Sequence, residues 1–409
     1  MSLAEPITAT TEPAKAKPFR RLVFYIPGYD PIHPRRYREL YRKEGADQAR
    51  ISGYPLTLHP KTTQGPYGWH VTSNAVEAEV QVLVWSDIVR DSMDQGIVAT
   101  YLQLIRTAWA YIGSGALFRL MYLRKGPMIA ALYPIGMLLL QLTLATMVGY
   151  LFYRPGALLH PVVGLLASAT VTLLLLRLFR ARDNRFYAYY LMHDYAFTAK
   201  GHGANPPELE TRMAEFRSLI AGALTPDVDE VLVVGHSSGA HLAVSILADL
   251  IRQGLPPGHP PLGFLSLGQV VPMVSFLPAA NRLRADLAYL SARSELTWVD
   301  VTAPGDGCAF ALCDPVSVTG VAPPDKRWPL VLSAAFTRTL SPERWKQLRW
   351  RFFRLHFQYL CAFDALSGGP GDYDYFQITA GPLTLRQRYE NRSPSKSRIE
   401  TPRSGFTST

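Results

Sequence analysis

Short apolar runs and amphipathic stretches alternate along most of the chain. Apolar runs rich in β-branched residues predict strands, and they cover residues 21–26, 76–87, 229–235, 262–274 and 296–303. Stretches with helical character lie between them, at residues 34–49, 94–123, 184–199, 208–224 and 279–292. Strands that alternate with helices predict an α/β fold, with a mostly parallel sheet that helices cover on both faces.

Two long uncharged runs interrupt this alternation. Residues 127–153 and 157–176 contain no charged side chain, and each reaches the roughly 18–20 apolar residues that span a bilayer. Their glycines and prolines are tolerated in lipid-embedded helices. A pair of buried core helices is the alternative, but two adjacent runs of this length are rare in a soluble fold. The pattern predicts a transmembrane helical hairpin at residues 127–180, with the lipid bilayer as its partner.

Basic residues flank the two runs on their outer sides. They are Arg119, Arg124 and Lys125 before the first run, and Arg177, Arg180, Arg182 and Arg185 after the second. The predicted turn at residues 154–156 holds only Arg154, so the positive-inside rule places both outer ends in the cytoplasm. Residues 19–126 and 181–385 then lie on one side of the membrane. We expect them to form one domain into which the hairpin is inserted.

The composition limits the classes of protein to which this chain can belong. Apolar residues make up 48% of the chain and charged residues only 18%, which suits burial in a core or in lipid. The net charge of +10 is spread over several clusters, so membrane topology explains it better than nucleic-acid binding does. The three cysteines lack CxxC spacing and predict neither a disulfide framework nor a zinc site. Residues 1–18 and the basic tail at 386–409 are polar and predicted to be disordered.

The most specific motif is G-x-S-x-G at residues 235–239, between an apolar strand and an Ala-rich helix. Gly235 and Gly239 have no Cβ, so strand and helix can pack closely around a strained turn. Ser237 would then stand at the positive end of the helix, where developing negative charge is stabilised. A Gly-Ser turn that matches by chance is the alternative. The flanking strand and helix favour a nucleophilic serine.

The order of elements, together with this motif, resembles the α/β-hydrolase superfamily over roughly residues 20–380, with the hairpin as a departure. The resemblance implies a nucleophile, an acid and a histidine in that order along the chain. Ser237 would be the nucleophile. Of the ten histidines, His356 alone follows the segment around Asp306, and it would act as the general base. A core or surface histidine on an amphipathic helix is the alternative for His356.

Four carboxylates compete for the role of the acid. Asp306 is preferred because it follows a strand in a Gly-rich loop, from which the acid of the family reaches the histidine; its alternative is a β-turn residue. Asp314 and then Asp300 are the fallbacks, and Asp325 lies in a polar Pro-rich loop. The gap from Asp306 to His356 is longer than the family usually shows. An inserted segment or lid at residues 324–340 would account for it.

An oxyanion hole requires two backbone N–H groups. Ser238, which follows the nucleophile, would supply one, and Tyr29, in the loop after the first strand, would supply the other. The family often has His-Gly at that loop, whereas this chain has Pro27-Gly28, which an ordinary type II turn would also explain. The histidines beside the motif have no ligands at metal-binding spacing. We therefore expect no metal and no cofactor.

These features predict a membrane-anchored serine hydrolase, of the carboxylesterase or lipase type, that cleaves an ester or thioester through an acyl-enzyme on Ser237. A hairpin beside the active site favours an acyl lipid or another amphipathic substrate. One alternative is an acyltransferase that uses the same triad. Another is a non-catalytic hydrolase-fold protein that binds partners at the membrane. A transporter is less favoured, because spans without internal charge offer no polar pathway.

Overall fold

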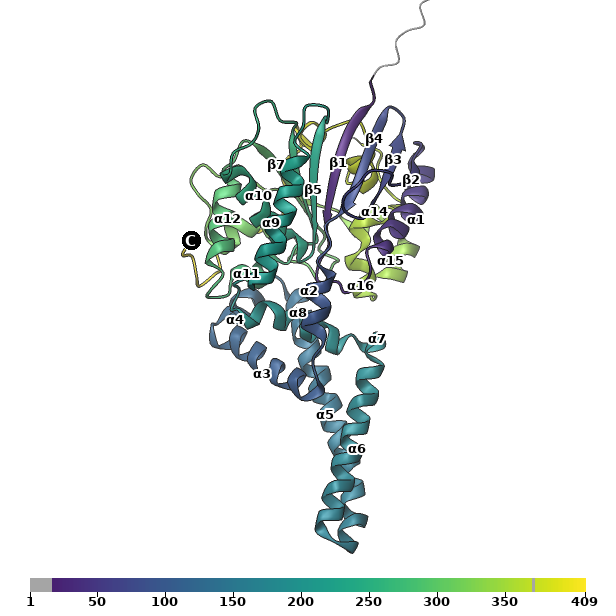
Figure 1. Ribbon diagram of the computed structural model, residues 1–409, viewed down its shortest axis with the longest axis vertical. Coiled ribbons are helices and arrows are strands. Elements are labelled where there is room, and N and C mark those ends of the chain that lie inside the picture. Colours follow the sequence, from purple (N-terminus) through teal and green to yellow (C-terminus); the bar gives the residue numbers. More distant parts are fainter. Residues whose placement is uncertain (1–16, 370–371) are drawn as a thin grey trace, which may run out of the picture.

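Eight strands form one sheet at the centre of the computed structural model, which describes residues 17–369 and 372–409 (Figure 1). The strands, in spatial order, are β2 (Thr57–Pro60), β3 (Gly68–Ser73), β4 (Val76–Val82), β1 (Phe19–Ile26), β5 (Glu230–His236), β6 (Leu262–Leu267), β7 (Leu296–Thr302) and β8 (Leu330–Ser333). β3 pairs antiparallel with both of its neighbours, and every other pair is parallel. The predicted α/β class with a mostly parallel sheet is confirmed.

Strands from both sides of the hairpin share this sheet, because β1 lies between β4 and β5. Arg21 on β1 and Glu230 on β5 are register partners, and their side chains form an ion pair of 2.5 Å that is completely buried. The Arg21 guanidinium also donates hydrogen bonds to the carbonyl oxygens of Gly381 and Leu383, each at 2.6 Å. Because a buried charge must be fully paired, this arginine fixes three distant parts of the chain to one another.

Alternate residues of the strands enter two cores, one on each face of the sheet. Phe24 packs with α9 (Pro207–Gly222), α10 (Gly239–Arg252) and α12 (Asn281–Ser291). Its neighbours Val23 and Tyr25 pack on the opposite face with α1 (Arg35–Ser52), α17 (Tyr375–Ala380) and α18 (Leu385–Tyr389). This alternation follows from the two-residue period of a strand, and the apolar runs of β1 and β5 reflect burial on both faces.

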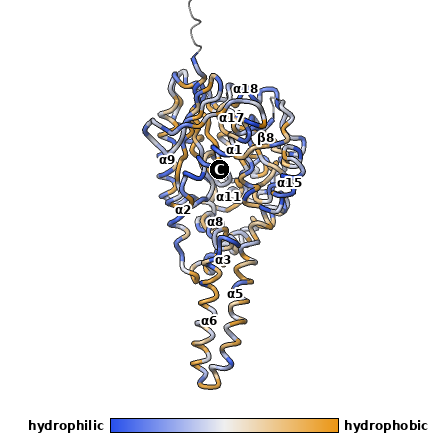
Figure 2. Tube along the Cα trace, turned by 90° about the vertical axis from the view of Figure 1, so that its right-hand side faces the viewer, coloured by the Kyte–Doolittle hydropathy of each residue, from blue (hydrophilic) through white to orange (hydrophobic). Residues whose placement is uncertain are grey.

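Two long helices, α5 (Lys125–Leu159) and α6 (Pro161–Ala181), extend from the domain as a hydrophobic hairpin (Figures 1 and 2). By length and composition both are able to cross a membrane. Only 28% of the apolar window of α5 and 11% of that of α6 are buried, which argues against the alternative of two core helices.

The turn of the hairpin is not where the sequence pattern placed it. Residues 154–156 are helical, and the chain reverses at His160. Pro161 explains the position, since a residue before proline is disfavoured in helical geometry and proline is well suited to the first turn of a helix. The Nδ1 atom of His160 accepts a hydrogen bond from the backbone N–H of Val162 and caps α6.

A layer of helices lies between the sheet and the hairpin (Figure 1). It contains α2 (Ser86–Met93), α3 (Ile97–Gly113), α4 (Ala116–Met121), α7 (Asp183–Phe186) and α8 (Ala188–Lys200). The remaining short helices are α11 (Val271–Ser275), α13 (Pro315–Thr319), α14 (Phe336–Thr339), α15 (Pro342–Leu348), α16 (Phe352–His356) and the 3-10 helix η1 (Gln358–Leu360).

Three further expectations need correction. The strand predicted at residues 262–274 ends at Leu267, and residues 271–274 belong to α11 instead. The segment 324–340, interpreted as an inserted segment or lid, supplies edge strand β8 and helix α14. The predicted disordered tail packs on the domain: Ile399 bridges to Cys313, and Arg284 donates a hydrogen bond of 2.7 Å to the carbonyl oxygen of Ser408. Residues 1–16 of the predicted disordered N-terminus lie outside the described residues.

Candidate active site

Ser237 occupies a tight turn between β5 and α10, as the sequence motif predicted. Its φ angle of 56° lies in the left-handed region, which is costly for a residue with a Cβ. The backbone N–H of Ser237 donates a hydrogen bond of 2.9 Å to the carbonyl oxygen of Leu267, at the end of the adjacent strand. The fold therefore holds a strained serine at the carboxyl edge of the parallel strands, where ligands bind in open α/β sheets.

Two glycines allow the surrounding backbone to approach this serine. A Cβ at Gly239 would lie 2.1 Å from the carbonyl oxygen of Ile26, so α10 could not begin so close to β1 with any other residue. A Cβ at Gly28 would lie 2.9 Å from Cβ of Ser237 and 3.4 Å from its Oγ. The loop after β1 therefore packs directly on the serine side chain.

The two predicted oxyanion donors border the same turn. Neither the backbone N–H of Tyr29 nor that of Ser238 donates a hydrogen bond to another described residue. The loop that carries Tyr29 is held in place because Trp85 Nε1 donates to the Pro27 carbonyl oxygen at 2.9 Å and the Tyr190 hydroxyl donates to the Tyr29 carbonyl oxygen. Backbone N–H groups that are buried are nearly always paired, so free N–H groups here are suited to a bound oxyanion.

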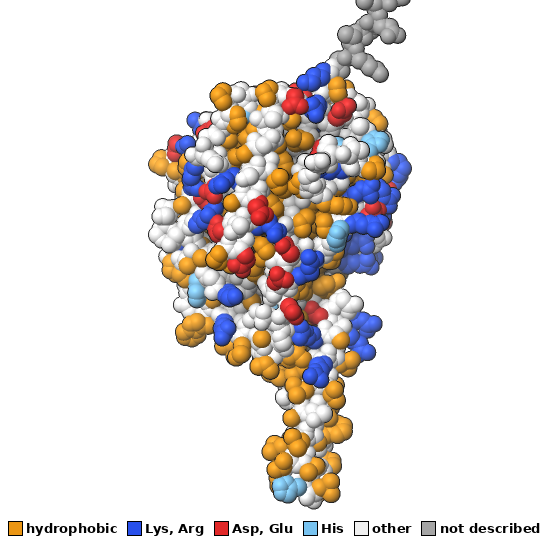
Figure 3. Space-filling model, in the orientation of Figure 1, with side chains coloured by type: hydrophobic (Ala, Val, Ile, Leu, Met, Phe, Trp, Pro, Cys, Tyr) orange, Lys and Arg blue, Asp and Glu red, His pale blue; other side chains and the backbone are white. Residues whose placement is uncertain are grey.

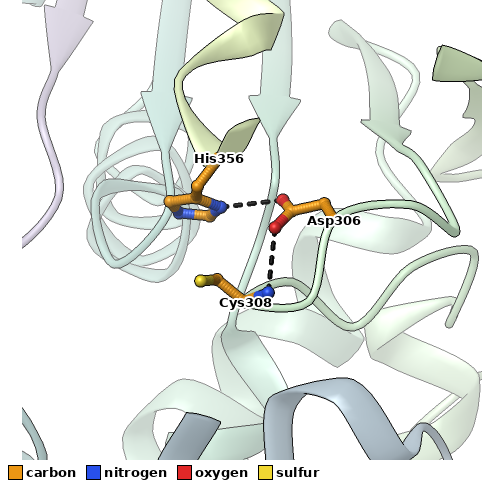
Figure 4. A group of neighbouring side chains, drawn as sticks. All are labelled: Asp306, Cys308 and His356. Atoms are coloured by element: carbon orange, nitrogen blue, oxygen red, sulfur yellow. Dashed lines mark hydrogen bonds and ion pairs between the residues drawn. The ribbon is translucent and has the colours of Figure 1, made fainter. Parts of the chain in front are cut away.

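His356 and Asp306 are directly joined (Figure 4). Nδ1 of His356 lies 2.7 Å from Oδ2 of Asp306, and both side chains are at least 90% buried. The Asp306 carboxylate also accepts hydrogen bonds from the backbone N–H of Cys308 at 2.9 Å and from the Tyr359 hydroxyl at 3.0 Å. Burial would raise the pKa of Asp306, but His356 and these hydrogen bonds hold that pKa below its ordinary value. Asp306 is thus an anion suited to orient an imidazole.

The other nitrogen of His356 lacks a partner in the described part of the chain. Its Nε2 atom is buried and forms no hydrogen bond with another described residue. His356 and Ser237 line the same cavity, without a hydrogen bond between them. In enzymes without substrate, hydrogen bonds between a nucleophile and its base are often long and shorten only in the reacting complex.

The other carboxylates considered for the acid are engaged elsewhere. Asp300 accepts a hydrogen bond of 2.6 Å from Ser266, and burial raises its pKa to about 8, so it is mostly neutral at pH 7. Asp314 caps α13 and forms an ion pair of 2.7 Å with Lys326. Asp325 is exposed. Of these four, Asp306 is the one bonded to His356.

A cavity of about 860 Å³ extends from this site to the start of the hairpin, at the beginning of α5. Ser237 and His356 line one part of it, and Pro127, Ile129 and Ala130 from the start of α5 line another. Aromatic side chains from α5, α8 and the region around α16 form much of the wall, among them Tyr133, Tyr187, Tyr190, Tyr195, Phe353 and Phe357. The volume and the apolar lining are typical of small-molecule sites.

The sequence pattern missed two side chains of this site. Tyr359 reaches Asp306 from η1, and no motif marks it. Asp194 on α8 lines the cavity, and burial raises its pKa to about 7, which the nearby His356 partly opposes. A lone acid in the aromatic stretch at residues 186–197 could have drawn attention to Asp194.

Cys308, Asp306 and His356 offer potential metal ligands within 4.8 Å of one another. Both oxygens of Asp306 already accept hydrogen bonds, one of them from Nδ1 of His356. Burial raises the pKa of the Cys308 thiol well above its usual value, so the thiol stays protonated and is a poor ligand. This arrangement favours a hydrogen-bonded acid–histidine pair over a metal centre.

His236, at the end of β5, helps to hold His356 and Asp306 in position. Its Nε2 donates a hydrogen bond of 3.0 Å to the carbonyl oxygen of His356 and thereby fixes the end of α16. Burial lowers the pKa of His236 to about 3, and that of His241 to about 4, so both are neutral at pH 7. Neither competes with His356 as a proton carrier.

We compared the chain with models of protein families, with curated proteins and with solved structures, and none of these comparisons finds a significant match. The chemistry of the site is therefore inferred from its residues and their geometry.

Proposed function

We propose that the protein is a membrane-anchored serine hydrolase of the α/β-hydrolase fold that cleaves a carboxylic ester or thioester. One observation carries the proposal: His356 bonds Asp306 through Nδ1, while its Nε2 has no partner among the described residues and the histidine lines a cavity that Ser237 also lines. The strand–turn–helix around Ser237 and its strained backbone support it.

In this mechanism Ser237 Oγ attacks the carbonyl carbon of the substrate while Nε2 of His356 accepts the hydroxyl proton. Asp306 stabilises the resulting imidazolium through Nδ1. The oxyanion receives hydrogen bonds from the backbone N–H groups of Tyr29 and Ser238, at the positive end of α10. His356 then returns the proton to the departing alcohol or thiol, and a water molecule, activated in the same way, hydrolyses the acyl-enzyme.

The same proposal assigns a location and a substrate class. The basic residues that flank the hairpin support a cytoplasmic location of the domain by the positive-inside rule. The start of α5 and Ser237 line the same cavity, which supports entry of the substrate from the bilayer. An acyl lipid is the substrate class that best fits an apolar cavity at this position.

Labelling with a fluorophosphonate probe tests the proposal on the detergent-solubilised full chain. Wild type should be labelled, and Ser237→Ala and His356→Ala should not. Ser218→Ala is the matched control, since Ser218 is an exposed serine on α9. A folded wild type that takes no label would favour the non-catalytic binding protein. With unlabelled wild type and an ester substrate, transfer of the acyl group from Ser237 to an added alcohol, in preference to water, would favour the acyltransferase.

A further inference from the structure

Three arginine side chains line the same cavity at its exposed rim. Arg185 lies in α7, Arg351 precedes α16 and Arg354 lies within α16. All three are exposed, and none of their guanidinium groups forms a hydrogen bond or ion pair with another described residue. The rim therefore carries concentrated positive charge that no described acidic residue pairs with.

The positive-inside rule explains Arg185, which flanks the hairpin, but it does not explain the other two. Arg351 and Arg354 are distant from the hairpin in sequence, and the fold brings them to it. The ring of Phe353 packs against that of Tyr187 with centroids 4.6 Å apart, which joins α16 to the end of α7. Figure 3 shows basic side chains where the hairpin joins the domain, above its hydrophobic surface.

Exposed aromatic side chains accompany the arginines. Trp350 is 72% exposed and Phe352 is 51% exposed, and both line the cavity. Aromatic rings beside arginines are typical of the interface between lipid and water. On α3 a second apolar stripe is exposed at helical spacing, formed by Val98, Leu102, Ile105, Trp109 and Ile112. The helical layer next to the hairpin thus presents interfacial residues from α3 and from the region of α16.

The interior of the cavity offers no such cation. Apart from the three arginines, no described Lys or Arg lines the cavity, and its acidic lining residues are Asp30, which pairs with Arg36 at 2.8 Å, and the buried Asp194. A negatively charged group is therefore favoured at the arginine rim and disfavoured inside. This polarity would orient an amphipathic anion with its charged end outward and its acyl ester toward Ser237.

We propose that Arg185, Arg351 and Arg354 bind the phosphate headgroup of an anionic bilayer lipid. Guanidinium groups bind phosphate oxygens through paired hydrogen bonds, and the start of α5 in the cavity wall sets the rim at headgroup level. The substrate class of the hydrolase is then an anionic acyl lipid, a step that rests on the proposed function.

Native mass spectrometry of the detergent-solubilised full chain tests the headgroup site without catalysis. Wild type should retain dioleoyl phosphatidylglycerol over dioleoyl phosphatidylcholine by roughly tenfold, the effect of about one charge-assisted hydrogen bond. Arg351→Gln combined with Arg354→Gln should abolish the preference. The control, Lys43→Gln with Arg338→Gln, removes two exposed cations outside the cavity and should keep it.

Equal retention of the two lipids by wild type, or an unchanged preference in the double arginine variant, would overturn the headgroup site. Glycerol phosphate at equal concentration should not displace the lipid; displacement would assign the site to a soluble phosphate compound. Fluorophosphonate labelling separates the two proposals. If wild type takes no label but keeps its lipid preference, only the hydrolase proposal fails. If wild type is labelled but shows no lipid preference, only the proposed headgroup site fails.

Discussion

The hydroxyl group of Tyr359 lies 3.0 Å from Oδ2 of Asp306 and donates a hydrogen bond to it. The same hydroxyl accepts a hydrogen bond of 3.0 Å from the backbone N–H of Ala303, so two hydrogen bonds fix its position. A hydrogen bond to a carboxylate favours its ionised form. In the proposed mechanism Tyr359 is therefore a positioning residue for Asp306, which orients His356.

Replacement of this tyrosine should affect the reaction more than the fold. In Tyr359→Phe the ionised carboxylate loses one hydrogen bond, worth about 1.5–3 kcal/mol, and the pKa of Asp306 rises. We expect kcat/KM for a short-chain ester to fall by roughly tenfold or more, with the acidic limb of its pH profile moved to higher pH. A uniform loss of activity at all pH values, matched by a lower unfolding temperature, would indicate a purely structural role.

The close approach of Gly28 to Ser237 gives a second prediction. A methyl group at Gly28 would lie 2.9 Å from Cβ of Ser237 and must displace either the loop or the serine. Gly28→Ala should therefore lose most fluorophosphonate labelling while the protein still folds. Gly222→Ala is the control, because a Cβ there meets nothing within 4 Å. That variant should keep full labelling and be as stable as wild type or slightly more stable.

Two buried aspartates should differ sharply in their effect on catalysis. Asp306→Asn leaves the shape of the site but removes the charge that orients His356, and kcat should fall by about 10³–10⁴-fold. Asp300→Asn should change kcat little, because Asp300 bonds Ser266 and is mostly neutral at pH 7. Steady-state kinetics on both variants would check this. The reverse ranking would transfer the role of the acid to Asp300.

Asp300 should instead influence how stability depends on pH. Burial raises its pKa to about 8 in the folded state, whereas an aspartate in the unfolded chain titrates near about 3.9. Between these values the folded state binds the extra proton. Its contribution is therefore complete below about pH 4 and is lost as the pH rises towards 8. Thermal unfolding should show a smaller decrease from pH 5 to pH 8 in Asp300→Asn than in wild type; parallel curves would contradict it.

Cysteine labelling tests the side of the membrane on which the domain lies. Leu158, beside the turn at His160, is 88% exposed. In intact cells Leu158→Cys should react with a membrane-impermeant maleimide, whereas Ser218→Cys on α9 should react only after the membrane is opened. Labelling of Ser218→Cys alone would reverse the orientation. Labelling of both in intact cells would contradict an assignment based on the positive-inside rule.

The elements that sequence alone could locate are those whose pattern is strong. The central parts of β1 and β5 are buried on both faces, so each strand contains an uninterrupted apolar run. β2 and β8 each have only four residues and lie at the two edges of the sheet, where burial imposes little pattern. The turn at His160 was misplaced because Arg-Pro-Gly is a turn signal in water, whereas α5 continues through it.

The residues of the candidate site also differ in how far the sequence could predict them. The turn around Ser237 is local, and the order of residues implied by the family resemblance pointed to His356 and Asp306, which the fold brings to 2.7 Å. Tyr359 and Asp194 reach the site through tertiary packing, and no local spacing encodes such contacts. The arginines of the rim have the same origin, because two of them approach the hairpin only in the folded chain.

The position of β1 between β4 and β5 has a consequence for biosynthesis. The ribosome completes β1 through β4 and then both hairpin helices before it makes the strand that covers the open side of β1. The sheet of the nascent domain therefore remains incomplete while the hairpin leaves the exit tunnel. His356 follows later still, so the candidate site cannot form before the hairpin has been synthesised. The order of the chain thus makes both hairpin helices available for insertion before this site is complete.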